Sequence, residues 1–130
     1  MPADRPSDDR FGRGWDTVNQ INAEGAQRQW DALSAISPDF ARWIVESAYC
    51  DVLGRPQLPL RDREIATLAA LAALGNAPGQ LKAHVEGALN VGLAKDEIVE
   101  VLMQMAIYAG VPAAINALQI AGDVFEARGL

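Results

Sequence analysis

The chain has 130 residues, half of them apolar, and a formal net charge of −6, which is typical of one domain with one hydrophobic core. Its basic residues are scattered, so it lacks the basic patch of a nucleic-acid-binding protein. No apolar stretch is long enough and free enough of polar residues to span a bilayer. The one cysteine, Cys50, excludes a disulfide within the chain and favours a cytosolic location.

Residues 1–14 are charged and rich in proline and glycine. They lack the apolar segment of a signal peptide, and we expect a disordered N-terminal tail. Residues 15–130 are expected to form a single helical domain. A small anionic ligand is compatible with the negative net charge, because a few arginines in one cleft outweigh distant acidic residues.

The first half of this domain predicts two or three helices. Residues 15–36 form one or two amphipathic helices, with Gly25 as the expected break. A second helix spans residues 37–54, with Ser37 as its N-cap and Pro38 in its first position. Its apolar residues are mostly spaced three and four apart: Phe40, Trp43, Ile44, Ala48 and Val52. Residues 55–60, with two prolines, form a loop.

The second half predicts four more helices. Residues 61–75 are apolar almost all round and should form the central, buried helix. They are followed by helices over residues 79–92, 95–110 and 112–127, and we expect three of the helix ends at Gly75, Gly92 and Gly110. β-Branched residues do not alternate with polar ones over a useful length. The sequence therefore predicts an all-α bundle of about six helices.

His84, the one histidine of the chain, lies at the edge of the apolar stripe of its helix. Gly87 and Ala88 follow at helical spacing and leave room beside the imidazole, while Gln80 lies one turn earlier. From periodicity alone, His84 is either a boundary residue bonded to a neighbouring helix or a functional group. A lone histidine without a paired ligand cannot build a usual zinc site.

Glu64 lies in the first turn of the most apolar helix. Its carboxylate either faces solvent near the helix N-terminus or turns inward and orients a histidine, which fixes the tautomer and raises the basicity of that histidine. Cys50 is predicted to be an inert, buried thiol, because it lies near a helix C-terminus beside the acidic Asp51.

Three segments in order resemble the carboxymuconolactone decarboxylase family of the alkyl hydroperoxidase D-like superfamily. They are "RP.L..RDRE" (55–64), "H..GALN.G" (84–92) and "EIVEVL.Q.A.YAG.PAA..A" (97–117), and the likeness covers residues 38–127. It implies an all-α fold, a homotrimer or homohexamer, and sites at subunit contacts. It also implies that Glu64 and His84 fill the family's catalytic glutamate and histidine positions.

The same resemblance separates this chain from the thiol-dependent branch of the superfamily. That branch carries two cysteines before the histidine, at positions that Ala77 and Gln80 occupy here. The chain also departs from the lactone decarboxylases at Tyr49–Asp51 and in its N-terminal part. The resemblance therefore supports the fold more specifically than the substrate.

We expect a cofactor-independent decarboxylase of a small cyclic carboxylic acid such as 4-carboxymuconolactone, an intermediate of aromatic catabolism. An unsaturated lactone accepts the electron pair left by carbon dioxide, so neither a metal nor an organic cofactor is needed. His84, oriented by Glu64, would donate the proton or bind the oxyanion. The residues expected to bind the substrate or its carboxylate are Arg55, Arg61, Arg63, Gln80, Gln104 and Tyr108.

Other functions stay open at this point. A tailoring decarboxylase or isomerase would act on another cyclic acid in a biosynthetic pathway. A non-catalytic assembly subunit would share the fold without the chemistry. A thiol-dependent hydroperoxidase is disfavoured, because Cys50 has no second cysteine to form a disulfide with.

Overall fold

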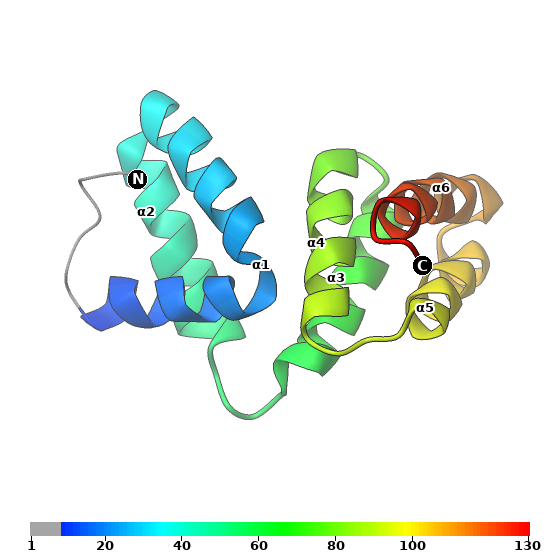
Figure 1. Ribbon diagram of the computed structural model, residues 1–130, viewed down its shortest axis with the longest axis horizontal. Helices are drawn as coiled ribbons and strands as arrows, with labels where there is room; N and C mark the ends of the chain where they lie inside the picture. Colours follow the sequence, from blue (N-terminus) through cyan, green and yellow to red (C-terminus); the bar gives the residue numbers. More distant parts are fainter. Residues whose placement is uncertain (1–8) are drawn as a thin grey trace. The chain divides into compact units, whose positions relative to one another are not determined.

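The computed structural model describes residues 9–130, and every regular element in this range is a helix (Figure 1). In chain order the elements are α1 (Asp9–Ile36), α2 (Pro38–Trp43), the π-helix η1 (Ile44–Leu53), α3 (Leu60–Leu74), α4 (Pro78–Asn90), α5 (Lys95–Tyr108) and α6 (Val111–Ala127). The prediction of an all-α protein with about six helices is confirmed.

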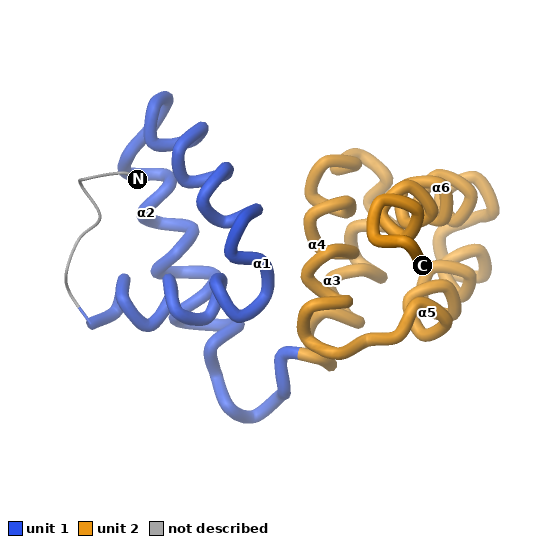
Figure 2. The backbone as a smooth tube through the Cα atoms, viewed as in Figure 1, with its two compact units in different colours: residues 1–60 blue, residues 61–130 orange. Residues whose placement is uncertain are grey.

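The chain forms two compact units, residues 1–60 and residues 61–130 (Figure 2), and each is described by itself. A single domain over residues 15–130 stays a prediction. Residues 1–8 of the expected tail lie outside the described residues. The rest of that segment is not a tail, because α1 begins at Asp9 and buries Phe11, which is 2% exposed.

Helix α1 has a kink at Asn22, three residues before the break expected at Gly25. Asn22 has extended backbone angles (φ −157°, ψ 86°), and its Oδ1 accepts a hydrogen bond of 3.0 Å from the Gly25 N–H. This is the geometry of a helix N-cap. The asparagine side chain competes for the backbone and starts a new helix, whereas Gly25 lies inside that helix.

Helix α2 begins as predicted, with the Ser37 Oγ accepting from the Phe40 N–H at 3.3 Å and Pro38 in the first position. The predicted apolar face, however, is wrong. Ala41, Val45 and Tyr49 are buried, whereas Phe40 and Trp43 are about half exposed. The chain continues from α2 into η1, whose turns are wider than α-helical turns, and residues four apart therefore line up on the buried side.

The core of unit 1 is aromatic and is bordered by ion pairs. Trp30 packs edge-on against Phe11 and Trp15, with ring centroids 5.2 and 5.8 Å apart. At the start of α1, the Arg10 guanidinium binds the carboxylate of Asp51 on η1 through two hydrogen bonds. This contact lowers the pKa of Asp51 and joins α1 to η1.

Unit 2 has an aliphatic core to which α3, α4, α5 and α6 all contribute. Its fully buried residues include Leu68, Ile98 and Leu102, and each such side chain stabilises the fold by about 2 kcal/mol. Helix α6 packs against both α4 and α5. Within this unit α6 therefore holds the central place that the sequence predicted for α3, whose last residue, Leu74, is 66% exposed.

The predicted helix ends of unit 2 are confirmed. Gly75, Gly92 and Gly110 each follow a helix closely and have φ between 70° and 104°. Glycine adopts this left-handed conformation without the steric cost that other residues meet. The connections between these helices are therefore short, and the apolar faces of α3 and α4 contribute to the same core.

Candidate active site

Glu64 turns inward, and of the two orientations left open by the sequence this is the one observed. Its side chain is 0% exposed, and Leu68 and Ala72, four and eight residues later, are also buried on α3. The carboxyl group therefore lies on the same helix face as the core leucine and alanine. A carboxylate is costly to bury unless a partner offsets the lost hydration, and such a partner has to come from a neighbouring helix.

His84 on α4 is that partner. Its Nδ1 lies 2.9 Å from Glu64 Oε2, and its side chain is 15% exposed. The residues flanking it on the inner face of α4, Leu81, Val85 and Ala88, are buried. The imidazole thus stands at the boundary between core and surface, with one nitrogen facing the buried carboxylate.

This contact fixes the tautomer of His84. With Glu64 ionised, Nδ1 carries the proton and donates it to Oε2, which leaves Nε2 as the ring nitrogen that can act on another molecule. A neutral imidazole offers a lone pair at Nε2, whereas an imidazolium offers a proton there and is stabilised by the carboxylate. The pair can therefore accept and return one proton at a defined atom.

Glu64 Oε1 is buried and has no hydrogen-bond partner among residues 9–130. An unpaired buried acceptor costs about 1–3 kcal/mol. A catalytic role is one of the reasons for which native proteins keep such a group. The Glu64 carboxyl group thus contacts His84 through one oxygen, and burial of its other oxygen without a partner lowers the stability of the fold.

Of the three predicted arginines, Arg61 is engaged within unit 2. Its guanidinium binds the carboxylate of Glu97, in the first turn of α5. The other Glu97 oxygen accepts from the Ala94 N–H at 3.0 Å. This backbone hydrogen bond, followed by the Arg61 contact, lowers the pKa of Glu97. Arg61 therefore joins the start of α3 to the start of α5.

The remaining predicted site residues are distributed more widely. Arg63, next to Glu64, is partly buried; Gln80 on α4 and Gln104 on α5 are exposed, and Tyr108 is 79% exposed. Arg55 belongs to unit 1. Glu64 and His84 are the two predicted residues that a described hydrogen bond brings together.

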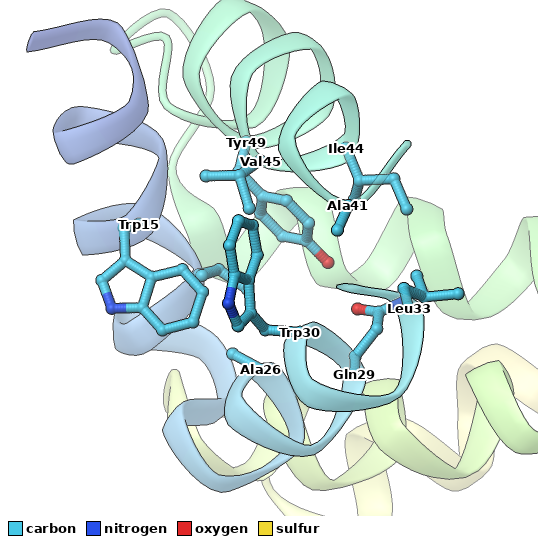
Figure 3. Close-up of a pocket in the computed structure, with 10 residues that line it drawn as sticks. Trp15, Ala26, Gln29, Trp30, Leu33, Ala41, Ile44, Val45 and Tyr49 are labelled. Carbon is cyan, nitrogen blue, oxygen red and sulfur yellow. The ribbon is translucent and has the colours of Figure 1, made fainter. Parts of the chain in front are cut away.

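Three cavities were not predicted from the sequence. In unit 1, an aromatic pocket of about 20 Å³ is lined by residues that include Trp15, Trp30 and Tyr49 (Figure 3). A second one, the Arg55 pocket, has about 210 Å³ between α1 and the loop before α3. In unit 2, a groove of about 380 Å³ lies along α6 and contains Asp123. The spacing of Ala26, Trp30 and Leu33 is a helical signal that could have indicated the first.

Trp30 is the residue of the aromatic pocket that sequence reasoning missed most clearly. It is 6% exposed, and its Nε1 is buried without a hydrogen-bond partner among the described residues. The pocket is small and its lining is mostly apolar. It fits an interior packing gap better than a catalytic cleft, because few polar groups converge on it.

The chain belongs to the carboxymuconolactone decarboxylase family, whose sequence model matches residues 38–123. It is 32% identical over 122 residues to the 4-carboxymuconolactone decarboxylase of Acinetobacter baylyi, an alignment that covers 93% of this chain and 90% of the relative. It is 30% identical over 124 residues to the nitrosuccinic acid decarboxylase of Metarhizium robertsii, with 91% and 85% covered. The predicted family is confirmed, and the matched segment includes both Glu64 and His84.

A third relative carries no activity in its name. It is a 15.0 kDa protein from the nqo9–nqo10 intergenic region of Paracoccus denitrificans, 32% identical over 95 residues, which are 72% of this chain and 71% of the relative. Within residues 9–130, no helix combines the length and apolar character needed to cross a membrane. In the same range, no three His, Cys, Asp or Glu residues are grouped so that they could hold a metal ion.

Proposed function

We propose that this protein is a cofactor-independent decarboxylase of a small organic acid, with His84 as the proton donor and Glu64 as the residue that orients it. The observation that carries the proposal is the 2.9 Å contact between His84 Nδ1 and the fully buried Glu64. Membership of a decarboxylase family supports it. A buried carboxylate on one ring nitrogen and partial exposure of the ring are what a proton donor needs.

The two named relatives suggest the kind of substrate. One is named for 4-carboxymuconolactone and the other for nitrosuccinic acid. In both compounds a carboxylate stands on a carbon from which an electron pair can be delocalised, through an alkene to a lactone carbonyl or directly to a nitro group. We infer that the substrate of this chain also carries its own electron acceptor.

The reaction then needs little from the protein. The bond between the substrate carbon and its carboxylate breaks, carbon dioxide leaves, and the electron pair moves to an oxygen of the lactone or nitro group. The carbon end of this dienolate or nitronate takes a proton from Nε2 of the His84 imidazolium, and the now neutral imidazole is reprotonated from water. Glu64 stabilises the imidazolium through Nδ1 and holds the ring in place.

The substrate has a second requirement, a cationic group for its carboxylate. Arg55, Arg61 and Arg63 are the proposed carboxylate partners; Arg63 lies beside Glu64 on α3, and the Arg61 guanidinium binds Glu97. Gln80, Gln104 and Tyr108 are proposed to line the site.

We propose a homotrimer or homohexamer in which subunit contacts complete the site. Exposed apolar side chains on α5 and at the start of α6 support such contacts: Met103, Ile107, Tyr108, Val111 and Ile115.

Carbon dioxide release from 4-carboxymuconolactone and from nitrosuccinate tests the proposal and separates its two versions. Faster turnover of the lactone favours a role in aromatic catabolism, and faster turnover of another acid favours a tailoring enzyme. His84→Ala and Glu64→Gln should lose activity with either substrate, and Lys82→Ala, an exposed position on α4, is the matched control. Wild-type turnover by folded His84→Ala protein would exclude the proposed role.

A further inference from the structure

The first turn of α3 leads into the buried Glu64 but has no buried side chain of its own. Residues 60–63 are all partly exposed, and Glu64 is the first buried residue of the helix. The next buried residue is Leu68, one turn further along. Because a segment with few buried side chains opens more easily than the core, the position of the Glu64 carboxyl group depends on the contacts that hold this first turn.

Arg61 joins the first turn of α3 to α5. Its guanidinium binds the carboxylate of Glu97 in the first turn of α5, and Arg61 precedes Glu64 by about one helical turn. A second ion pair of Arg61, to the adjacent Asp62 at 3.9 Å, lies within α3 itself. Of the described ion pairs of Arg61, the one with Glu97 is therefore the contact that holds the start of α3 against another helix.

Glu97 is well ordered for a carboxylate near the surface. An ion pair between two mobile side chains contributes little, because ordering both of them costs entropy. Glu97 Oε1, however, already accepts a hydrogen bond of 3.0 Å from the Ala94 N–H at the start of α5. Ile98, the next residue, is 0% exposed, and Lys95 Nζ lies 5.5 Å from the ring centroid of Phe125 on α6. The first turn of α5 is thus a fixed point within unit 2.

The contact between Glu64 and His84 needs accurate placement of α3. Glu64 Oε2 lies 2.9 Å from His84 Nδ1, and such hydrogen bonds extend only to about 3.2 Å. A movement of the first turn by about 1 Å would therefore break the contact. The ion pair with α5 and the hydrogen bond to α4 both start from this end of α3, so the first can hold the geometry of the second.

We propose that Glu97 is a positioning residue for the candidate active site: through Arg61 it holds the first turn of α3, so that Glu64 stays in contact with His84. Its effect on catalysis rests on the proposed function, whereas its effect on the imidazole does not. This role is separate from the carboxylate binding proposed for Arg61, because weaker substrate binding raises KM, whereas a misplaced proton donor lowers kcat.

The imidazole signal of His84 tests the placement directly, because His84 is the one histidine of the chain. In isotopically labelled full-length protein, nuclear magnetic resonance measures how fast the Nδ1 proton exchanges with water. Glu97→Gln keeps an oxygen for the Ala94 N–H but loses its charge, and it should speed this exchange by about twofold to fivefold, the range for a lost surface ion pair. Glu100→Gln, an exposed change on the same helix, is the matched control.

Two further measurements separate positioning from a general structural effect. Glu97→Gln should lower kcat for carbon dioxide release by a similar factor and leave KM within about twofold. Arg61→Gln and the double variant should speed the Nδ1 exchange as much as Glu97→Gln does, because all three proteins lack the same contact.

Unchanged Nδ1 exchange in folded Glu97→Gln protein would overturn the proposal, and so would equal effects of Glu100→Gln or additive effects of the Arg61 and Glu97 substitutions. An effect of Glu97→Gln on KM alone would also overturn it. Faster exchange in a protein that decarboxylates nothing would refute the proposed function alone. Decarboxylation that requires His84, with unchanged exchange in Glu97→Gln, would refute the positioning role alone.

Discussion

Each unit contains one buried glutamate, and the carboxylate oxygens of these two residues have different partners. Glu46 on η1, 7% exposed, has both carboxylate oxygens near arginines: Oε1 is 2.8 Å from Arg42 Nε, and Oε2 is 3.7 Å from Arg10 Nη1. Glu64 on α3 has an imidazole on one oxygen and no described partner on the other.

The difference separates a structural contact from a candidate catalytic one. Arginine keeps its charge at any pH that the fold survives, so the Glu46 cluster holds no proton that it can transfer. An imidazole can carry a proton on either ring nitrogen, so the Glu64 contact at Nδ1 leaves Nε2 as the nitrogen that can transfer a proton. A buried carboxylate alone therefore does not indicate a catalytic site, whereas a buried carboxylate that contacts an imidazole does.

Replacement of His84 is expected to have the largest effect. The variant His84→Ala should lose about 10²- to 10⁴-fold in kcat, the usual contribution of a positioned acid or base, while its circular dichroism stays that of the wild type. Steady-state carbon dioxide release measures the loss. A drop of less than threefold would place His84 among the boundary residues that periodicity also allows.

Matched Glu→Gln variants test the comparison directly. Glu64→Gln should lower kcat by about 10- to 100-fold, the usual range for a residue that orients a catalytic or ligating histidine. It should change the free energy of unfolding by less than about 1 kcal/mol, because a neutral amide is less costly to bury.

Glu46→Gln should show the reverse pattern. It should lower the free energy of unfolding by about 1–2 kcal/mol, because two charge-assisted contacts are lost, and leave kcat within about twofold. Urea unfolding and the same activity assay measure both variants. The comparison fails if the two substitutions affect stability and activity alike.

The sequence predicted much of the fold because helix signals are local. The Ser37 cap and the glycines after α3, α4 and α5 each act within one turn of the chain. The kink at Asn22 was missed because asparagine is compatible with a helix interior as well as a cap. The π-helix was missed because its wider turn leaves no distinct apolar spacing, and its buried face shifted accordingly.

The site was predictable in its residues but not in its geometry. A glutamate in the first turn of a helix satisfies the helix dipole whether it points outward or inward, so only the fold could place Glu64 in the core. The contact between Arg61 and Glu97 joins residues 36 positions apart, and no local pattern indicates it. The Arg55 pocket likewise depends on the approach of Gly54 to Thr17, which is a tertiary feature.

The two units can also be compared through one buried polar atom in each that has no described hydrogen-bond partner, with a smaller expected effect on stability. Unit 1 buries the Trp30 N–H without a described partner, as unit 2 buries Glu64 Oε1. Trp30→Phe removes this donor but keeps an aromatic ring against Phe11, so it should cost only about 1–2 kcal/mol of unfolding free energy, against about 3–5 for Trp30→Ala. Urea denaturation measures both, and equal losses would show that the indole N–H has a partner after all.

The smallest effect concerns the partly exposed carboxylate of Glu97, and its sign can be derived. The Ala94 N–H and the Arg61 guanidinium lower the pKa of Glu97 from its ordinary 4.5. A group with a lowered folded-state pKa stabilises the protein above its unfolded pKa, and this contribution is lost as pH falls through the folded value. Between about pH 5 and pH 3, the Tm of Glu97→Gln should therefore fall less steeply than that of the wild type. Glu100→Gln, an exposed change on the same helix, is the matched control, and parallel slopes for all three proteins would contradict the assigned role of Glu97.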